Sequence, residues 1–125
     1  VMKELNNGKQ MTDVWRLPAI ARWEKSCGKH PTQKPLALLS RIILASTQPG
    51  AWILDPFAGS STTGIAANLL GRKFIGIDQS KDFLDYGIRR KQEIEIPDVR
   101  EKILKKMFWV NSMCLMYRNK VPKKV

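Results

Sequence analysis

The stretch that decides the fold is Ile53-Leu54-Asp55-Pro56-Phe57-Ala58-Gly59-Ser60-Ser61-Thr62-Thr63-Gly64. It follows Gly50 and joins an apolar run over residues 51–55 to a turn rich in glycine and hydroxyl groups. A short apolar run bounded by glycine and proline is typical of a fully buried parallel strand. The turn leads into a helical pattern over residues 61–70, whose small residues allow close approach to a sheet. Strand, tight turn and helix in this order predict an α/β unit.

The neighbouring segments extend this unit in both directions. Gly71 suits a left-handed helix cap, Asp78 ends a second apolar run, and Ser80 is a favourable N-cap. The apolar spacing predicts helices over residues 35–47 and 81–94 and a second buried strand over residues 73–78. This order is half of a doubly wound α/β fold, so we expect a partial Rossmann-like architecture.

The two ends of the chain differ from this α/β region, residues 30–96. Residues 1–29 form a loop-rich lead-in with at most one short strand. Residues 97–125 form a basic helix and tail, in which Asp98 and Glu101 resemble a capping box that opens a helix over residues 98–107. Residues 108–117 are apolar enough for a strand or a helix end, and their period does not decide between the two.

Composition excludes several classes of protein. The 125 residues are 43% hydrophobic and 26% charged, which suits one globular domain or part of one. No apolar run is long enough for a bilayer span and no signal peptide is recognisable, so we expect a cytoplasmic protein without a membrane partner. Cys27, Cys114 and the single His30 match no metal-binding or disulfide spacing, so we expect no metal site.

The net charge of +11 is concentrated at the ends of the chain. Residues 1–34 carry seven basic and three acidic side chains, and residues 97–125 carry eight and two. Such flanks favour a polyanion partner, most often nucleic acid, through phosphate contacts. A basic surface that serves only solubility is the alternative.

The spacing of Gly59 and Asp78 indicates a nucleoside pocket. Asp78 lies 19 residues after Gly59, where a strand-end carboxylate commonly accepts both hydroxyls of a ribose. The turn offers N–H groups and hydroxyls to an anionic tail. The dinucleotide pattern GxGxxG is absent, because only its first and last glycines, Gly59 and Gly64, are present. A structural turn with an incidental acid remains the alternative.

A second candidate site is the segment KHPTQKP, residues 29–35, directly before the first long helix. It gathers a hydroxyl, an amide and an ammonium group near a helix N-terminus, which suits an anion. His30 is a conceivable general base, but it has no acid or nucleophile partner in the sequence. A role as a turn or capping residue is favoured.

KHPTQKP, LDPFAGSSTTG and FIGIDQS, in this order, resemble the amino-methylating DNA methyltransferases of the permuted β arrangement. These enzymes modify adenine N6 or cytosine N4 in double-stranded DNA, and the resemblance covers roughly residues 13–92. It implies a Rossmann-like fold with S-adenosylmethionine as the cofactor.

The resemblance also implies roles for individual residues. The family's first cofactor motif implies that the pocket is lined by Asp55, Pro56, Phe57, Ala58, Gly59, Ser60 and Ser61, with Thr62 and Thr63 near the cofactor carboxylate. In the second motif, Asp78 would bind the ribose hydroxyls, and Gln79 and Ser80 would lie near the adenine. The segment of His30, Pro31, Thr32, Gln33 and Lys34 would close over the methionine end, with Lys34 as charge partner of the carboxylate.

The chain departs from the family in two respects. The family usually has glycine where this chain has Ser61; we expect the serine to enter the helix without strain and cofactor binding to be weakened rather than lost. The family also holds the flipped base with an Asp, Asn or Ser followed by Pro-Pro and an aromatic residue. The chain has no Pro-Pro pair. Asp55-Pro56-Phe57 resembles that motif but runs straight into the glycine turn, which favours a cofactor role.

The sequence therefore predicts the C-terminal, cofactor-binding part of a DNA amino-methyltransferase that is inactive by itself. An upstream region or a partner chain would supply the catalytic and target-recognition residues. One alternative is an incomplete remnant that binds cofactor or DNA without turnover. Another, a nucleotide-binding subunit of an oxidoreductase, is disfavoured because GxGxxG is absent and HPTQKP is present. Half a sheet with open edges favours a partner or a homo-oligomer.

Overall fold

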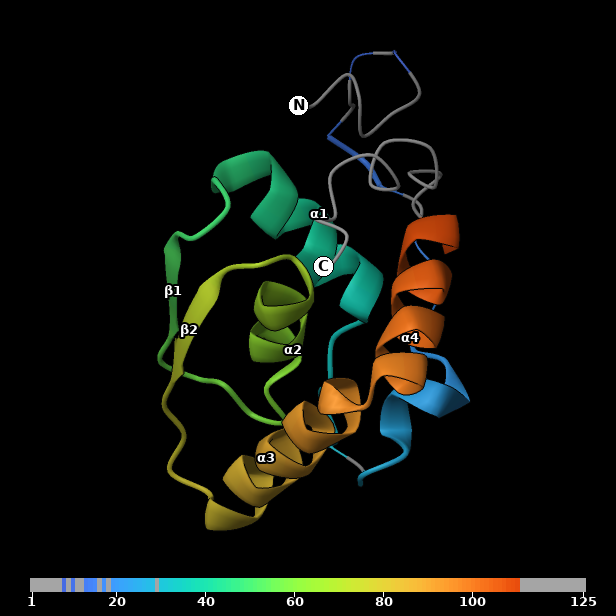
Figure 1. Cartoon of the computed structure of the whole chain (residues 1–125). Coiled ribbons are helices and arrows are strands. Elements are labelled where there is room, and N and C mark those ends of the chain that lie inside the picture. Colours follow the sequence, from blue (N-terminus) through green and yellow to red (C-terminus); the bar gives the residue numbers. More distant parts are fainter. Residues whose placement is uncertain are drawn as a thin grey trace.

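The described part of the chain contains two parallel strands, four α-helices and one 3-10 helix. The computed structural model describes residues 8, 10, 13–15, 17, 19–28 and 30–110. In chain order the elements are the 3-10 helix η2 (Arg22–Lys25), α1 (Leu36–Ser46), β1 (Trp52–Asp55), α2 (Thr62–Leu69), β2 (Lys73–Gly76), α3 (Lys81–Glu95) and α4 (Pro97–Val110). Figure 1 shows both strands at one side of the molecule, with α1 and α2 next to them and α4 on the far side. The predicted α/β class is confirmed.

Strands β1 and β2 form a parallel pair connected by α2. Trp52 pairs with Lys73 and Asp55 pairs with Gly76. The pairing continues past β2, because the N–H of Ile77 donates to the carbonyl of Asp55 at 2.9 Å. The N–H of Ala58 in turn donates to the carbonyl of Ile77 at 2.9 Å. The residues that follow both strands are therefore brought together at one edge of the sheet, as expected for a βαβ unit.

The hydrophobic core lies among the helices, and the inner face of the sheet packs against it. Its buried members come from α1, α2, α3, α4 and the loop after α2: Leu36, Ile43, Ile65, Ala66, Ala67, Leu69, Leu70, Ile94 and Met107. Gly64 lets α2 approach the sheet, since a Cβ there would lie 2.5 Å from Cε1 of Phe74. The small residues of α2 thus have the packing role that the sequence indicated.

The strands are buried on only one face, so the prediction of fully buried strands is wrong. Ile53 and Phe74 pack against the core. On the opposite face Trp52, Leu54, Ile75 and Ile77 are 65%, 62%, 50% and 55% exposed. Side chains alternate along a strand, and the described helices cover one face. We call these four residues the open sheet face.

The predicted helices before residue 96 are confirmed within one or two residues. Ser80 caps α3 by accepting a hydrogen bond from the N–H of Phe83 at 3.5 Å, and Gly71 has a positive φ of 72°. The last helix differs from prediction, because α4 begins at Pro97 and Asp98 lies inside its first turn. Glu101 instead pairs with Lys105 at 2.6 Å, so the capping-box prediction is wrong. Residues 111–117 lie outside the described residues.

The lead-in contributes to the fold through η2. Among its described residues there is no strand, so the short strand allowed by the sequence is not observed there. Glu24 is buried, and its Oε2 accepts a hydrogen bond from the N–H of Leu36 at 2.8 Å. The carboxylate therefore satisfies a donor at the N-terminus of α1 and lies at the favourable end of the helix dipole. Within the described ranges, no helix is both long and apolar enough to cross a bilayer.

Candidate functional site

Asp55, the last residue of β1, organises the turn that follows it. Its Oδ1 accepts a hydrogen bond from the N–H of Phe57 at 3.0 Å. Its Oδ2 accepts one from the Thr63 hydroxyl at 2.6 Å. Both carboxylate oxygens therefore bond within the turn and the first residues of α2. This arrangement supports a turn-forming role for Asp55-Pro56-Phe57 rather than a base-holding one.

Asp78 joins the two strand ends directly. Its Oδ2 accepts a hydrogen bond from the N–H of Gly59 at 2.8 Å, and its Oδ1 accepts one from the N–H of Ser80 at 2.8 Å. These backbone hydrogen bonds, from Ser80 first and then Gly59, lower the pKa of the Asp78 carboxyl below its ordinary value. A carboxylate has about four acceptor positions, so two backbone donors leave capacity for further hydroxyl donors.

His30 places the HPTQKP segment against the glycine turn. Gly59 has a φ of +52°, and a Cβ there would lie 2.9 Å from Nε2 of His30. The ring also packs on Phe83, with 4.1 Å between ring centroids, and its Nδ1 accepts a hydrogen bond from the N–H of Thr32 at 3.2 Å. These contacts agree with the interpretation of His30 as a turn residue. Gly59 is required both by its backbone conformation and by the nearby ring.

Gln33 connects the same segment to the core rather than to the surface. It is buried, and its Nε2 donates to the carbonyl of Glu24 at 2.8 Å. Its Oε1 accepts from the Ser60 hydroxyl at 3.4 Å. Pro31, Thr32 and Lys34 are exposed beside it. The HPTQKP segment is thus anchored by Gln33, while Lys34 remains at the surface.

Ser61 adopts a left-handed backbone conformation, so the expectation that it enters the helix without strain is wrong. Its φ and ψ are 58° and 35°, and it occupies the N-cap position of α2. The left-handed conformation is less stable by about 1–2 kcal/mol for a residue that has a Cβ. The family's usual glycine would avoid that cost. The strain follows from the tight turn, which needs a positive φ at Gly59 and again at Ser61.

The structure places the predicted site residues in two groups. One group is buried or half-buried at the strand ends and the glycine turn: His30, Gln33, Asp55, Ala58, Gly59, Ser60, Ser61, Thr62, Thr63, Asp78 and Ser80. The other lies exposed around it and comprises Pro31, Thr32, Lys34, Pro56, Phe57 and Gln79. Phe57 is the most exposed of these at 87%. Ala58 is buried beneath the turn, and the buried Thr62 hydroxyl bonds to Arg90.

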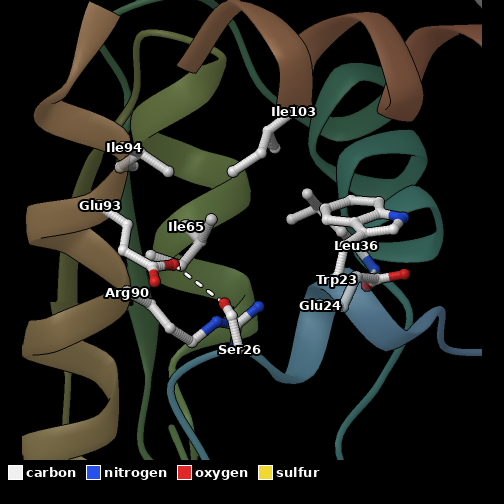
Figure 2. A pocket seen from close by; sticks show the side chains of 9 residues that line it. All are labelled: Trp23, Glu24, Ser26, Leu36, Ile65, Arg90, Glu93, Ile94 and Ile103. Carbon is white, nitrogen blue, oxygen red and sulfur yellow. Dashed lines mark hydrogen bonds between the residues drawn. The ribbon is translucent and has the colours of Figure 1, made fainter. Parts of the chain in front are cut away.

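Sequence reasoning missed two buried charged residues, Glu24 and Arg90. Both line a small cavity behind the glycine turn, shown in Figure 2, together with Trp23, Ser26, Leu36, Ile65, Glu93, Ile94 and Ile103. Their burial involves partners far away in the chain: the N–H of Leu36, 12 residues from Glu24, and the carbonyl of Ser60, 30 residues from Arg90. Arg90 could have been noticed as a charge on the same helix face as Gly87 and Ile94.

Comparisons with known proteins identify relatives of this chain. It is similar to the Type II methyltransferase M2.MboI of Moraxella bovis, with 63% identity over 94 residues, which cover 75% of this chain and 34% of that protein. The DNA adenine methyltransferase YhdJ of Escherichia coli strain K12 is 51% identical over 85 residues, covering 68% of this chain and 29% of that protein. The chain therefore spans about a third of the length of the curated relatives it matches.

A solved structure and a family model agree with these relatives. The crystal structure of an M1.HpyAVI–SAM complex matches with a TM-score of 0.50 and 49% identity, over 50% of this chain and 31% of that one. The family model described as DNA methylase matches residues 2–89, which include the glycine turn, Asp78 and the HPTQKP segment. The chain therefore belongs to the DNA methylase family.

Proposed function

We propose that this chain is the S-adenosylmethionine-binding part of a DNA amino-methyltransferase. The observation that carries the proposal is the direct hydrogen bond between Gly59 and Asp78. Through this bond the glycine turn and the acid at the end of the second strand form a single site. The similarity to M1.HpyAVI, solved as a SAM complex, covers half of the chain and supports the same cofactor.

The residues present fit this cofactor. Asp78 retains acceptor capacity for the two ribose hydroxyls after its two backbone bonds. The His30 ring packs directly on the turn, because it lies where a side chain of Gly59 would be, with Nε2 only 2.9 Å from the position of a Cβ. The exposed Phe57 offers an aromatic surface next to the turn, and Lys34 offers a cation for a carboxylate. Gln79 and Ser80 follow Asp78 in the chain and would lie near the adenine in this proposal.

In this proposal the chain binds and orients the methyl donor. S-adenosylmethionine supplies an electrophilic methyl group on its sulfonium for transfer to the exocyclic amine of a base in double-stranded DNA. The name of YhdJ favours adenine N6 over cytosine N4 as the acceptor. Because no described residue provides a base-holding motif, we propose that this chain has no turnover alone. DNA as substrate favours the cytoplasm as its location.

Isothermal titration of the chain with S-adenosylmethionine tests this function, with a nicotinamide dinucleotide as the matched control. Saturable binding of S-adenosylmethionine alone is the expected result. Binding of the dinucleotide instead would favour the oxidoreductase alternative. Absence of binding with either ligand would contradict a preformed cofactor site.

We further propose a binding partner for the open sheet face of Trp52, Leu54, Ile75 and Ile77. The partner is the part of the methyltransferase that lies outside the region matched by this chain in its relatives. That part makes up about two thirds of the relatives' length. The four side chains form an apolar surface on a sheet of two strands, each with an unpaired edge in the described part of the chain. Exposed apolar sheet faces of this kind mark interaction surfaces. A second copy of the chain is the competing occupant.

Complementation distinguishes these occupants. The part of M2.MboI outside the matched third would be mixed with this chain, and methyl incorporation into DNA would be measured. Activity in the mixture but in neither part alone is the expected result. A stable dimer of this chain by light scattering, without complementation, would favour the second copy. A monomer without complementation would favour an incomplete remnant.

A further inference from the structure

Arg90 is a buried cation that bonds to the glycine turn from the side of α3. Its side chain is 8% exposed. Its Nη1 donates to the carbonyl of Ser60 at 2.8 Å and to the hydroxyl of Thr62 at 2.9 Å, and lies 3.3 Å from the Ser60 hydroxyl. Figure 2 shows the side chain reaching from α3 toward the segment that carries Ser26. One nitrogen atom thus holds the residues on both sides of Ser61.

The packing of α3 on the turn is equally close at Gly87. This residue lies one helical turn before Arg90, on the same face of α3. A Cβ at Gly87 would lie 2.6 Å from Oγ of Ser61. Gly87 therefore lets the helix approach the left-handed Ser61, and Arg90 bonds to its two neighbours. The contact is built around the strained residue of the turn.

Arg90 directs its hydrogen bonds to neutral oxygen atoms. Glu24 and Glu93 line the same cavity, but in the described part of the chain neither forms an ion pair with Arg90. Burial lowers the pKa of the guanidinium, and the more distant Glu24 raises it only in part. Hydrogen bonds from a buried cation are strong, and losing one partner leaves the rest of the group unsatisfied. The position of the turn and that of Arg90 therefore depend on each other.

We propose that Arg90 is a positioning residue for the cofactor site, holding Ser60 and Thr62 so that the turn keeps its binding conformation despite the left-handed Ser61. Arg90 is buried, so in this proposal it acts through Ser60 and Thr62. Its hydrogen bond to the Ser60 carbonyl fixes the peptide unit between Ser60 and Ser61. The N–H that bonds to Asp78 belongs to Gly59, two peptide units earlier in the same turn. This inference rests on the proposed cofactor function.

The test compares Arg90→Met with Arg89→Met. Both variants remove one positive charge from adjacent positions of α3, but Arg89 is exposed. Titration with S-adenosylmethionine is carried out well below the melting temperature of each variant, so that both are folded. Arg90→Met should weaken binding roughly tenfold, as expected for the loss of charge-assisted hydrogen bonds. Arg89→Met should leave binding unchanged. Equal binding by the two variants would overturn the inference.

A second variant and a second measurement keep the test decisive if Arg90→Met folds poorly or if the unmodified chain does not bind the cofactor. Thr62→Val removes one acceptor and keeps the buried cation, and it should weaken binding by about threefold. Amide hydrogen exchange at residues 59–62 should speed up in Arg90→Met and in Thr62→Val but not in Arg89→Met. If the unmodified chain does not bind, the proposed function fails, and the exchange rates still decide the role of Arg90. Unchanged exchange would refute that role.

Discussion

Gly59 donates its backbone N–H to Oδ2 of Asp78 over 2.8 Å, which ties the turn after β1 to the acid after β2. The two residues are 19 positions apart in the sequence. The parallel pairing brings them together, because the carboxyl ends of both strands lie at the same edge of the sheet. The carboxylate is therefore oriented before any ligand arrives, which lowers the cost of ordering the site on binding.

Asp78→Ala should weaken S-adenosylmethionine binding by roughly tenfold or more, since it removes the bond to Gly59 and the acceptor proposed for the ribose hydroxyls. Isothermal titration measures the change. Asp98→Ala is a matched control, because Asp98 is exposed in the first turn of α4. An unchanged affinity in Asp78→Ala would remove Asp78 from the ribose role.

The lowered pKa of Asp78 predicts a pH dependence of stability. Because the folded pKa lies below the ordinary value of 3.8, the ionised carboxylate stabilises the folded state above that value. This contribution is lost as the pH falls through the lowered pKa. Urea unfolding between about pH 5 and pH 2 should therefore show a steeper loss of stability in the unmodified chain than in Asp78→Asn. If the unmodified chain and Asp78→Asn lose stability equally with falling pH, the backbone hydrogen bonds of Asp78 are not the cause of the pH dependence.

Ser61→Gly should stabilise the chain by about 1 kcal/mol. The substitution removes the cost of a left-handed residue with a Cβ, and the greater freedom of glycine in the unfolded chain offsets part of the gain. Chemical unfolding measures the free energy. Ser46→Gly is the control, since Ser46 is helical in α1 and glycine there should destabilise. A loss of stability in Ser61→Gly would show that the packing of Ser61 on Gly87 outweighs the strain.

Gly64→Ala should destabilise the chain by about 1–3 kcal/mol, although alanine favours helices. The added Cβ would lie 2.5 Å from Cε1 of Phe74, which lies between α2 and the sheet. Thermal unfolding measures the change. Replacing Phe74 by Leu in the same chain should recover part of the loss. A neutral Gly64→Ala variant would mean that Phe74 can move aside.

Leu54→Thr should change the unfolding free energy of this chain by less than about 0.5 kcal/mol, since Leu54 is 62% exposed on the open sheet face. The same variant should reduce complementation with the unmatched part of M2.MboI. Ile88→Thr is the control, because Ile88 is similarly exposed but lies on α3. Equal complementation by both variants would argue against the open sheet face as the docking surface.

Local patterns in the sequence predicted most of the elements. The helices α1, α2 and α3 were predicted because their caps and breakers, Pro35, Gly71 and Ser80, act within a few residues of the chain. The capping box at Asp98 failed because Pro97 already begins α4. Proline suits the first helical position, so it took precedence over the Asp98 and Glu101 spacing.

The sequence by itself determined the strand, turn, helix and strand order, the family, and the residues of the glycine turn and Asp78. These depend on short-range periodicity and on motifs whose spacing is preserved in the linear chain. Only the tertiary structure decided that Ser61 is left-handed, that one sheet face is open, and that Arg90 and Glu24 are buried partners of the site. Those features depend on contacts between residues far apart in the chain, which no local pattern contains.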